Sequence, residues 1–151
     1  GMALTGLILG YITTVATILL IPLAAMATPA VFKAMQRAQT AQNISNARLL
    51  HLELTSYAYD HGGDFPPDLA TLETSGPNLD DFRFLDKDKK LRDWIYHPGL
   101  TDTSDPTFIL LAAPEASKRG SNPHMIVLHI DGSATLIPTA DYPGLLSAQA
   151  P

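Results

Sequence analysis

The first 32 residues of this chain of 151 residues carry no charged side chain. All 10 Lys and Arg residues and all 15 Asp and Glu residues lie at or after Lys33. The segment Ala3–Ala27 is almost entirely apolar, and about 20 apolar residues in a helix span a bilayer core of roughly 30 Å. Residues 1–32 are therefore predicted to form a hydrophobic helix that lies in a membrane or in the core of a filament.

The next stretch, residues 33–59, is charged but keeps a helical pattern without Gly or Pro. Its apolar residues recur three or four positions apart, which predicts an amphipathic half of the same helix. This apolar stripe consists of Ile44, Ala47, Leu50, Leu54 and Tyr57. The opposite, solvent-facing side is expected to contain Gln39, Gln42, Asn43, Ser45, Asn46 and Glu53. One helix from about residue 3 to about residue 59 should end where Gly62 and Gly63 follow.

Residues 60–151 are expected to form a globular head. Within it, residues 68–93 are predicted to be an irregular charged loop with one helical turn near Asp68–Glu73, capped by Asp68. Short apolar runs then predict strands at residues 94–96, 107–113, 124–130 and 133–138. The predicted fold class is α+β, with a long hydrophobic-then-amphipathic helix packed on a small antiparallel β-sheet.

The last two predicted strands are joined by Asp131-Gly132, a pair typical of tight β-hairpins. A two-residue turn at this pair would place Ile126 and Leu128 on the same face as Thr135 and Ile137. Both faces of the hairpin are fairly apolar, so we expect both to be covered, one of them by the stripe of the long helix.

Composition and motifs exclude several classes of function. A net charge of -5 opposes binding to nucleic acid, because phosphate groups repel an acidic surface. The chain has no Cys, which removes disulfides, thiolate metal sites and cysteine catalysis. Its five His residues fit no HExxH pattern, and the sequence has neither a phosphate-binding loop nor a GxSxG motif. The protein is therefore predicted not to be an enzyme and to need no cofactor.

Three segments together resemble the type IV pilin and type II secretion pseudopilin superfamily. They are the Ile21-Pro22 pair in the apolar helix, the helix exit YAYDHGGDFPP at residues 57–67, and HIDGSATLI at residues 129–137. The chain departs from that pattern at Thr5, where mature pilins have Glu. The resemblance implies a pilin-like lollipop that polymerises with copies of itself. It also implies a precursor in the inner membrane that an assembly machinery delivers to an extracellular filament on the bacterial cell surface.

The expected function is that of a structural subunit of a helical, type IV pilus-like filament, with apolar helices inside and acidic heads outside. Two alternatives remain open: a type II secretion pseudopilin, and a monomeric, membrane-anchored periplasmic binding domain. The filament hypothesis places the assembly interface on the apolar helix. The expected interface residues are Leu4, Thr5, Gly6, Leu9, Gly10, Ile12, Val15, Ile18, Leu19 and Pro22.

Three other features are candidate sites in the head and helix. Asp102 and Asp105 are weak calcium candidates, because some pseudopilins bind calcium in a loop before the final strands. A second acidic group could also supply oxygens, although we expect it to be solvated; it comprises Asp80, Asp81, Asp86 and Asp88. The glycosylation sequon at Asn43 lies within the predicted helix, which favours an accidental match.

Overall fold

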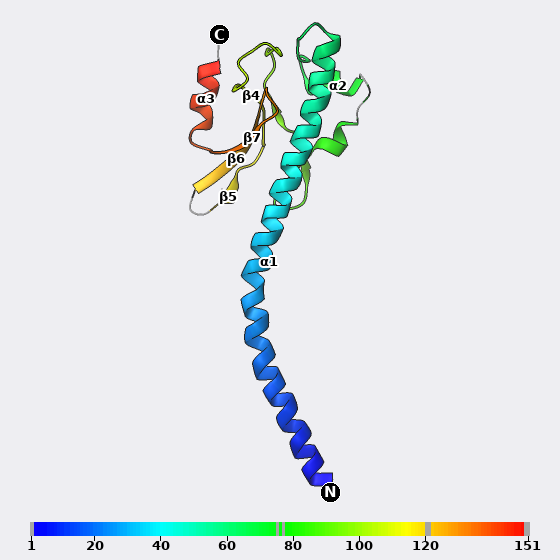
Figure 1. Cartoon of the computed structure of the whole chain (residues 1–151), viewed down its shortest axis with the longest axis vertical. Coiled ribbons are helices and arrows are strands. Elements are labelled where there is room, and N and C mark those ends of the chain that lie inside the picture. Colours follow the sequence, from blue (N-terminus) through cyan, green and yellow to red (C-terminus); the bar gives the residue numbers. More distant parts are fainter. Residues whose placement is uncertain (1, 75, 77, 120–121, 150–151) are drawn as a thin grey trace. The chain divides into compact units, whose positions relative to one another are not determined.

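The computed structural model describes the backbone of residues 2–74, 76, 78–119 and 122–149, and side chains from residue 29 onward except at 117–119. The chain divides into two compact units, Gly1–Thr40 and Ala41–Pro151. The secondary structure is α1 (Met2–Asp60), α2 (Leu69–Thr74), η1 (Leu79–Phe82), β1 (Phe84–Leu85), β2 (Leu91–Arg92), β3 (Ile95–Tyr96), β4 (Ile109–Ala112), β5 (Ser117–Arg119), β6 (Asn122–His129), β7 (Ala134–Pro138) and α3 (Tyr142–Gln149). Figure 1 shows these elements, and the α+β class is confirmed.

The single long helix α1 matches the predicted range closely. Its apolar stripe faces the core of the second unit: Ala47, Leu50 and Leu54 are buried, and Ile44 and Tyr57 pack against them. The helix ends at Asp60 because Gly62 and Gly63 adopt positive φ angles of 75° and 100°. These conformations let the Gly63 N–H donate to the Ala58 carbonyl at 2.8 Å, which satisfies an acceptor at the helix end.

Within the described residues from 29 onward, no helix is long and apolar enough to cross a membrane. The predicted apolar segment, residues 1–32, has its side chains described only at residues 29–32. There Val31 and Phe32 are exposed.

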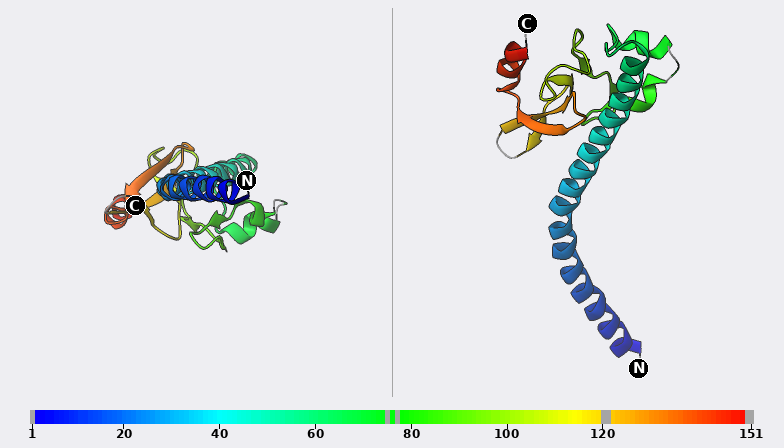
Figure 2. Two further views of the ribbon diagram at one scale, coloured as in Figure 1. Left: turned by 90° about the horizontal axis from the view of Figure 1, so that it is seen from below. Right: turned by 45° about the horizontal axis from the view of Figure 1, so that its top comes forward.

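The larger sheet is antiparallel and has five strands in the order β3–β4–β6–β5, with β7 pairing with β6. All residues of β4 are buried, as are Met125–Leu128 of β6. Successive strand residues point to opposite faces, so both faces of the sheet are covered at β4 and β6. The covering expected for both faces of the hairpin is incomplete, because no residue of β7 is buried. The second-unit part of α1 lies along one side of these strands and α3 lies on the other, as Figures 1 and 2 show.

The β6–β7 hairpin has the predicted strands but a different turn. Leu128 pairs with Ala134 and Val127 with Thr135, one position away from the register of a two-residue turn. The His129 N–H donates to the Ser133 carbonyl at 2.9 Å, and Gly132 has a φ of 78°. This is a three-residue loop that ends in a left-handed glycine, so the predicted facing of Ile126 and Leu128 with Thr135 is wrong.

The charged stretch 68–93 is more ordered than predicted. Asp68 caps α2 as expected, since its carboxylate accepts the Thr71 N–H at 2.7 Å. Beyond α2, however, the chain forms η1 and a two-stranded sheet of β1 and β2 instead of an irregular loop. Charged side chains of this stretch hydrogen-bond to nearby backbone groups. Such bonds depend on individual residues and leave no periodic pattern of hydropathy, so this secondary structure could not be predicted from such a pattern.

Two more elements of the head were not predicted. One is β5, a short strand that pairs with the start of β6. The other is α3, which follows the last predicted strand. It is held to the sheet by a contact of 2.8 Å between His97 Nε2 and the Tyr142 hydroxyl and by a bond of 3.2 Å from Gln149 Nε2 to the Ile109 carbonyl.

Candidate functional site

The ten residues predicted to form the assembly interface lie between positions 4 and 22. Their side chains lie outside the described residues. They are Leu4, Thr5, Gly6, Leu9, Gly10, Ile12, Val15, Ile18, Leu19 and Pro22. A candidate site can therefore be described only among residues whose side chains the structure describes.

Helix α1 presents a second apolar surface, on the side away from the core. In the second unit Leu49, Leu52 and Tyr59 are 47%, 63% and 87% exposed. Together with exposed polar residues they fall at spacings of three and four, which places them on one side of the helix. We call this surface the outer face; it consists of Gln42, Ser45, Leu49, Leu52, Ser56 and Tyr59. None of these six side chains is charged, although the exposed residues Arg48 and Asp60 directly adjoin Leu49 and Tyr59 in the sequence.

Polar bonds on the other side of α1 fix its rotation. The Asn43 amide donates to the Leu85 carbonyl and accepts from the Leu85 N–H, both at 2.9 Å. Asn46 donates to the Arg83 carbonyl at 2.9 Å. One turn further on, His51 Nε2 lies 2.7 Å from the Ile130 carbonyl, so that nitrogen carries the proton. These bonds, together with the buried stripe, keep the outer face turned away from the core.

Asn43 was predicted to face solvent, and this is wrong: it is 3% exposed. An asparagine amide has the donor and acceptor of a peptide group, so it can pair with a strand as another backbone would. Because both amide atoms are bonded to Leu85, the Asn43 side chain has no free position for a glycan in the folded protein. The interpretation of the sequon as accidental fits this geometry.

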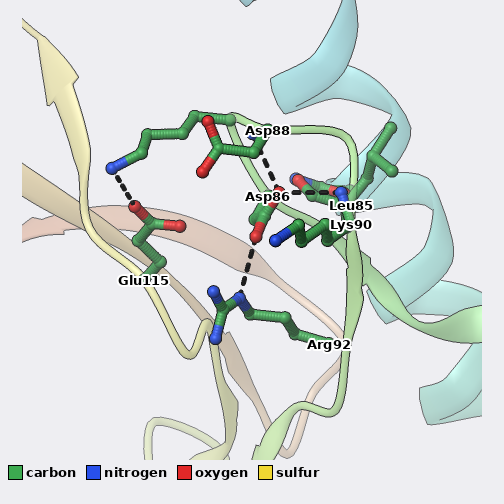
Figure 3. A network of polar contacts seen from close by, with 8 residues as sticks. Leu85, Asp86, Asp88, Lys90, Arg92 and Glu115 are labelled. Atoms are coloured by element: carbon green, nitrogen blue, oxygen red, sulfur yellow. Dashed lines mark hydrogen bonds and ion pairs between the residues drawn. The ribbon is translucent and has the colours of Figure 1, made fainter.

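Asp86 was expected to be solvated or to bind a cation, but it is a buried structural carboxylate, 1% exposed (Figure 3). Its Oδ1 accepts the N–H groups of Asp88 and Lys90 at 2.9 and 2.8 Å. Its Oδ2 accepts from Arg92 Nε at 2.9 Å. The Arg92 guanidinium, followed by the Lys90 N–H, lowers the pKa of Asp86, so the group stays ionised. Its oxygens thus hold the β1–β2 turn.

The neighbouring ion pair reaches across to the larger sheet. Lys87 Nζ lies 3.1 Å from Glu115 Oε1. Figure 3 shows this pair beside the Asp86 network, with Glu115 on the segment that leads from β4 to β5. The pKa of Lys87 is raised by its bond to Glu115. The small sheet is thereby linked to the larger one by a solvent-exposed contact, which contributes little to stability.

The two calcium candidates have separate structural surroundings. Asp105 accepts the Thr107 N–H at 2.9 Å and the Thr107 hydroxyl at 2.6 Å, and these bonds lower the pKa of Asp105. Asp102 follows the bridge between Asp64 and Thr101, and its N–H donates to the Gly63 carbonyl at 2.9 Å. Across the described part of the chain, no group of three or more His, Asp or Glu residues could hold a metal ion.

A small cavity of about 260 Å³ opens in the second unit between α1, α2 and η1. Its walls are Leu50, Leu69, Ala70, Glu73, Leu79, Arg83, Asp93 and Trp94. Trp94 is anchored by a bond of 2.8 Å from Nε1 to the Phe82 carbonyl and meets Phe84 edge-on. These residues come from three helices and two connecting segments and share no motif, so the cavity cannot be recognised in the sequence.

No protein-family model, curated protein or solved structure matches this chain.

Proposed function

We propose that this protein is a pilin-like structural subunit of a helical filament, assembled from copies of itself through α1. The observation that carries the proposal is the exposed, uncharged outer face of α1. The uncharged part of the same helix extends from Met2 to Phe32. Copies would bury both surfaces against each other, with the acidic head, residues 60–151, at the filament surface.

Exposure of apolar side chains to water is unfavourable. Large apolar side chains gathered on one exposed face commonly mark an interaction surface. Leu49 and Leu52 lie on neighbouring turns of α1, and the spacing of the outer face suits the interlocking of side chains between two helices. A contact between unlike surfaces of two copies gives an open helical fibre when its repetition does not close into a ring.

Charge supports a second copy as the occupant of the outer face. Residues 33–59 contain three basic side chains and one acidic side chain, whereas residues 60–151 contain seven basic and fourteen acidic ones. The basic helix of one copy can therefore lie beside the acidic head of the next without repulsion. Such attraction between unlike surfaces favours a staggered arrangement over head-to-head association.

The same apolar segment determines where the subunit would lie before assembly. Before assembly, the uncharged N-terminal segment would be held in the inner membrane, and a pilus or secretion machinery would transfer subunits into an extracellular fibre. A short periplasmic pseudopilus would use the same contacts and remains a second candidate. A monomeric, membrane-anchored binding domain would leave the outer face exposed, which favours the polymer over the monomer.

The test replaces one apolar side chain of the outer face with a charge. In Leu52→Glu we expect at least a tenfold loss of sedimentable fibres, because a buried carboxylate without a partner is costly. The matched control is Leu91→Glu, which alters a leucine of similar exposure on β2. Negative-stain microscopy and sedimentation of the full chain measure assembly, and Trp94 fluorescence verifies folding. The proposal fails if the wild type stays monomeric in detergent-free buffer, or if both variants assemble equally well.

A further inference from the structure

The cavity beside Trp94 is separate from the outer face of α1, and its chemistry indicates a ligand. Four of its eight lining residues have large apolar side chains: Leu50, Leu69, Leu79 and Trp94. Drug-sized ligands occupy pockets of about 300–1,000 Å³. A volume of about 260 Å³ therefore suits one side chain or a small organic molecule. All the lining residues belong to the second unit, so the cavity is complete within it.

The charges around the cavity are not balanced. Arg83 provides the one cation of the lining, and two carboxylates already neutralise it: Nε lies 2.9 Å from Asp93 Oδ1 and Nη1 lies 3.1 Å from Asp80 Oδ1. Glu73 adds a third carboxylate. It is exposed at the end of α2 and forms no ion pair with any residue whose side chain is described. The mouth of the cavity therefore carries an excess of negative charge.

We propose that this cavity binds a linear cationic group, an alkyl stem of about four carbons that ends in an ammonium or guanidinium. The stem would pack between Leu69 and Trp94 while the cation stays at the mouth beside Glu73. Long basic groups bury their methylenes and keep the charge near solvent in this way. The carboxylates repel an anion of the same length. A neutral alcohol of that length makes only the apolar contacts. A lysine or arginine side chain of a protein and a free alkylamine share this chemistry.

Trp94 allows a direct binding measurement because it is the single Trp of the chain and lines the cavity. The full chain, kept monomeric in a mild detergent, is titrated with n-butylammonium, Nα-acetyl-lysine amide, butanol and butyrate. We expect a saturable change in fluorescence with the two cations and at least fivefold weaker effects with the other two. If acetyl-lysine amide binds as well as butylammonium, the source is a protein side chain. Binding of butylammonium alone identifies a free amine.

Variants then test the placement of the ligand. Glu73→Gln should weaken binding of butylammonium about two- to fivefold, the effect of losing one solvent-exposed charge pair. Ala70→Phe fills the cavity from its rim and should abolish binding. Glu53→Gln, on α1 and outside the cavity lining, is the control and should bind like the wild type.

The proposal is overturned if neither cation gives saturable binding, if butyrate binds as well as butylammonium, or if Glu73→Gln and Ala70→Phe leave binding unchanged. It does not depend on polymerisation, since the titration uses monomers. A failure here leaves the filament proposal standing, and a failure to form fibres leaves the cavity proposal standing.

Discussion

Replacing Asn43 with alanine is expected to be one of the most damaging single changes in the second unit. The side chain is nearly fully buried and makes two bonds of 2.9 Å with the backbone of Leu85 in β1. It joins α1 to a small two-stranded sheet that has few other attachments to the helix. Asn43→Ala removes both bonds and leaves the space of the amide empty.

The expected loss in the free energy of unfolding follows from those two hydrogen bonds. An intramolecular hydrogen bond contributes about 1 kcal/mol net, and stranding a buried partner adds about 1–3 kcal/mol. Leu85 is half-buried as a residue, so we take the added cost to be at the low end. We expect Asn43→Ala to lower the free energy of unfolding by about 2–4 kcal/mol. With an m-value of about 2 kcal/mol/M, the urea midpoint falls by roughly 1–2 M.

Trp94 is a suitable reporter, because its ring meets Phe84, the neighbour of Leu85, at a centroid distance of 5.4 Å. Urea unfolding of the full chain in mild detergent is followed by its fluorescence. Asn46→Ala is the matched control: it removes one bond, to the Arg83 carbonyl, and should cost about 1 kcal/mol. If Asn43→Ala is no less stable than Asn46→Ala, the bidentate amide does not hold β1 as we argue.

Two further changes test the turns of the head. The folded pKa of Asp86 is lowered, so its ionised form stabilises the protein above the unfolded pKa of about 3.9, and this contribution is lost as the pH falls through the folded pKa. Asp86→Asn should therefore be less stable than the wild type at pH 7, with the difference shrinking below about pH 4; a constant difference in urea midpoint contradicts this. Gly132→Ala places a Cβ 3.2 Å from the His51 ring at a φ of 78° and should cost about 1–2 kcal/mol in thermal unfolding; an unchanged melting temperature contradicts the left-handed turn.

Much of the backbone plan could be predicted from the sequence. The apolar spacing from Ile44 to Tyr57 gave the helix face that packs on the core, because a helix of fixed period must turn its apolar residues to one side. The runs around Ile109 and Val127 gave buried strands for the same kind of reason. The candidate sites were harder to predict from the sequence. The outer face contains polar as well as apolar residues, and the cavity is lined by residues from three helices and two connecting segments.

Sequence alone therefore determined the features that depend on local periodicity and composition: the length of α1, its buried stripe, the antiparallel strands and the uncharged first 32 residues. Tertiary structure decided which polar groups are buried and where the hairpin turns. Asn43 and Asp86 look like surface residues in the sequence, but each finds backbone partners that only the folded chain brings near. The register of β6 against β7 depends on one loop residue, and a change of one position exchanges the two faces of a strand. Hydropathy records the average preference of a residue, whereas these outcomes depend on individual hydrogen bonds.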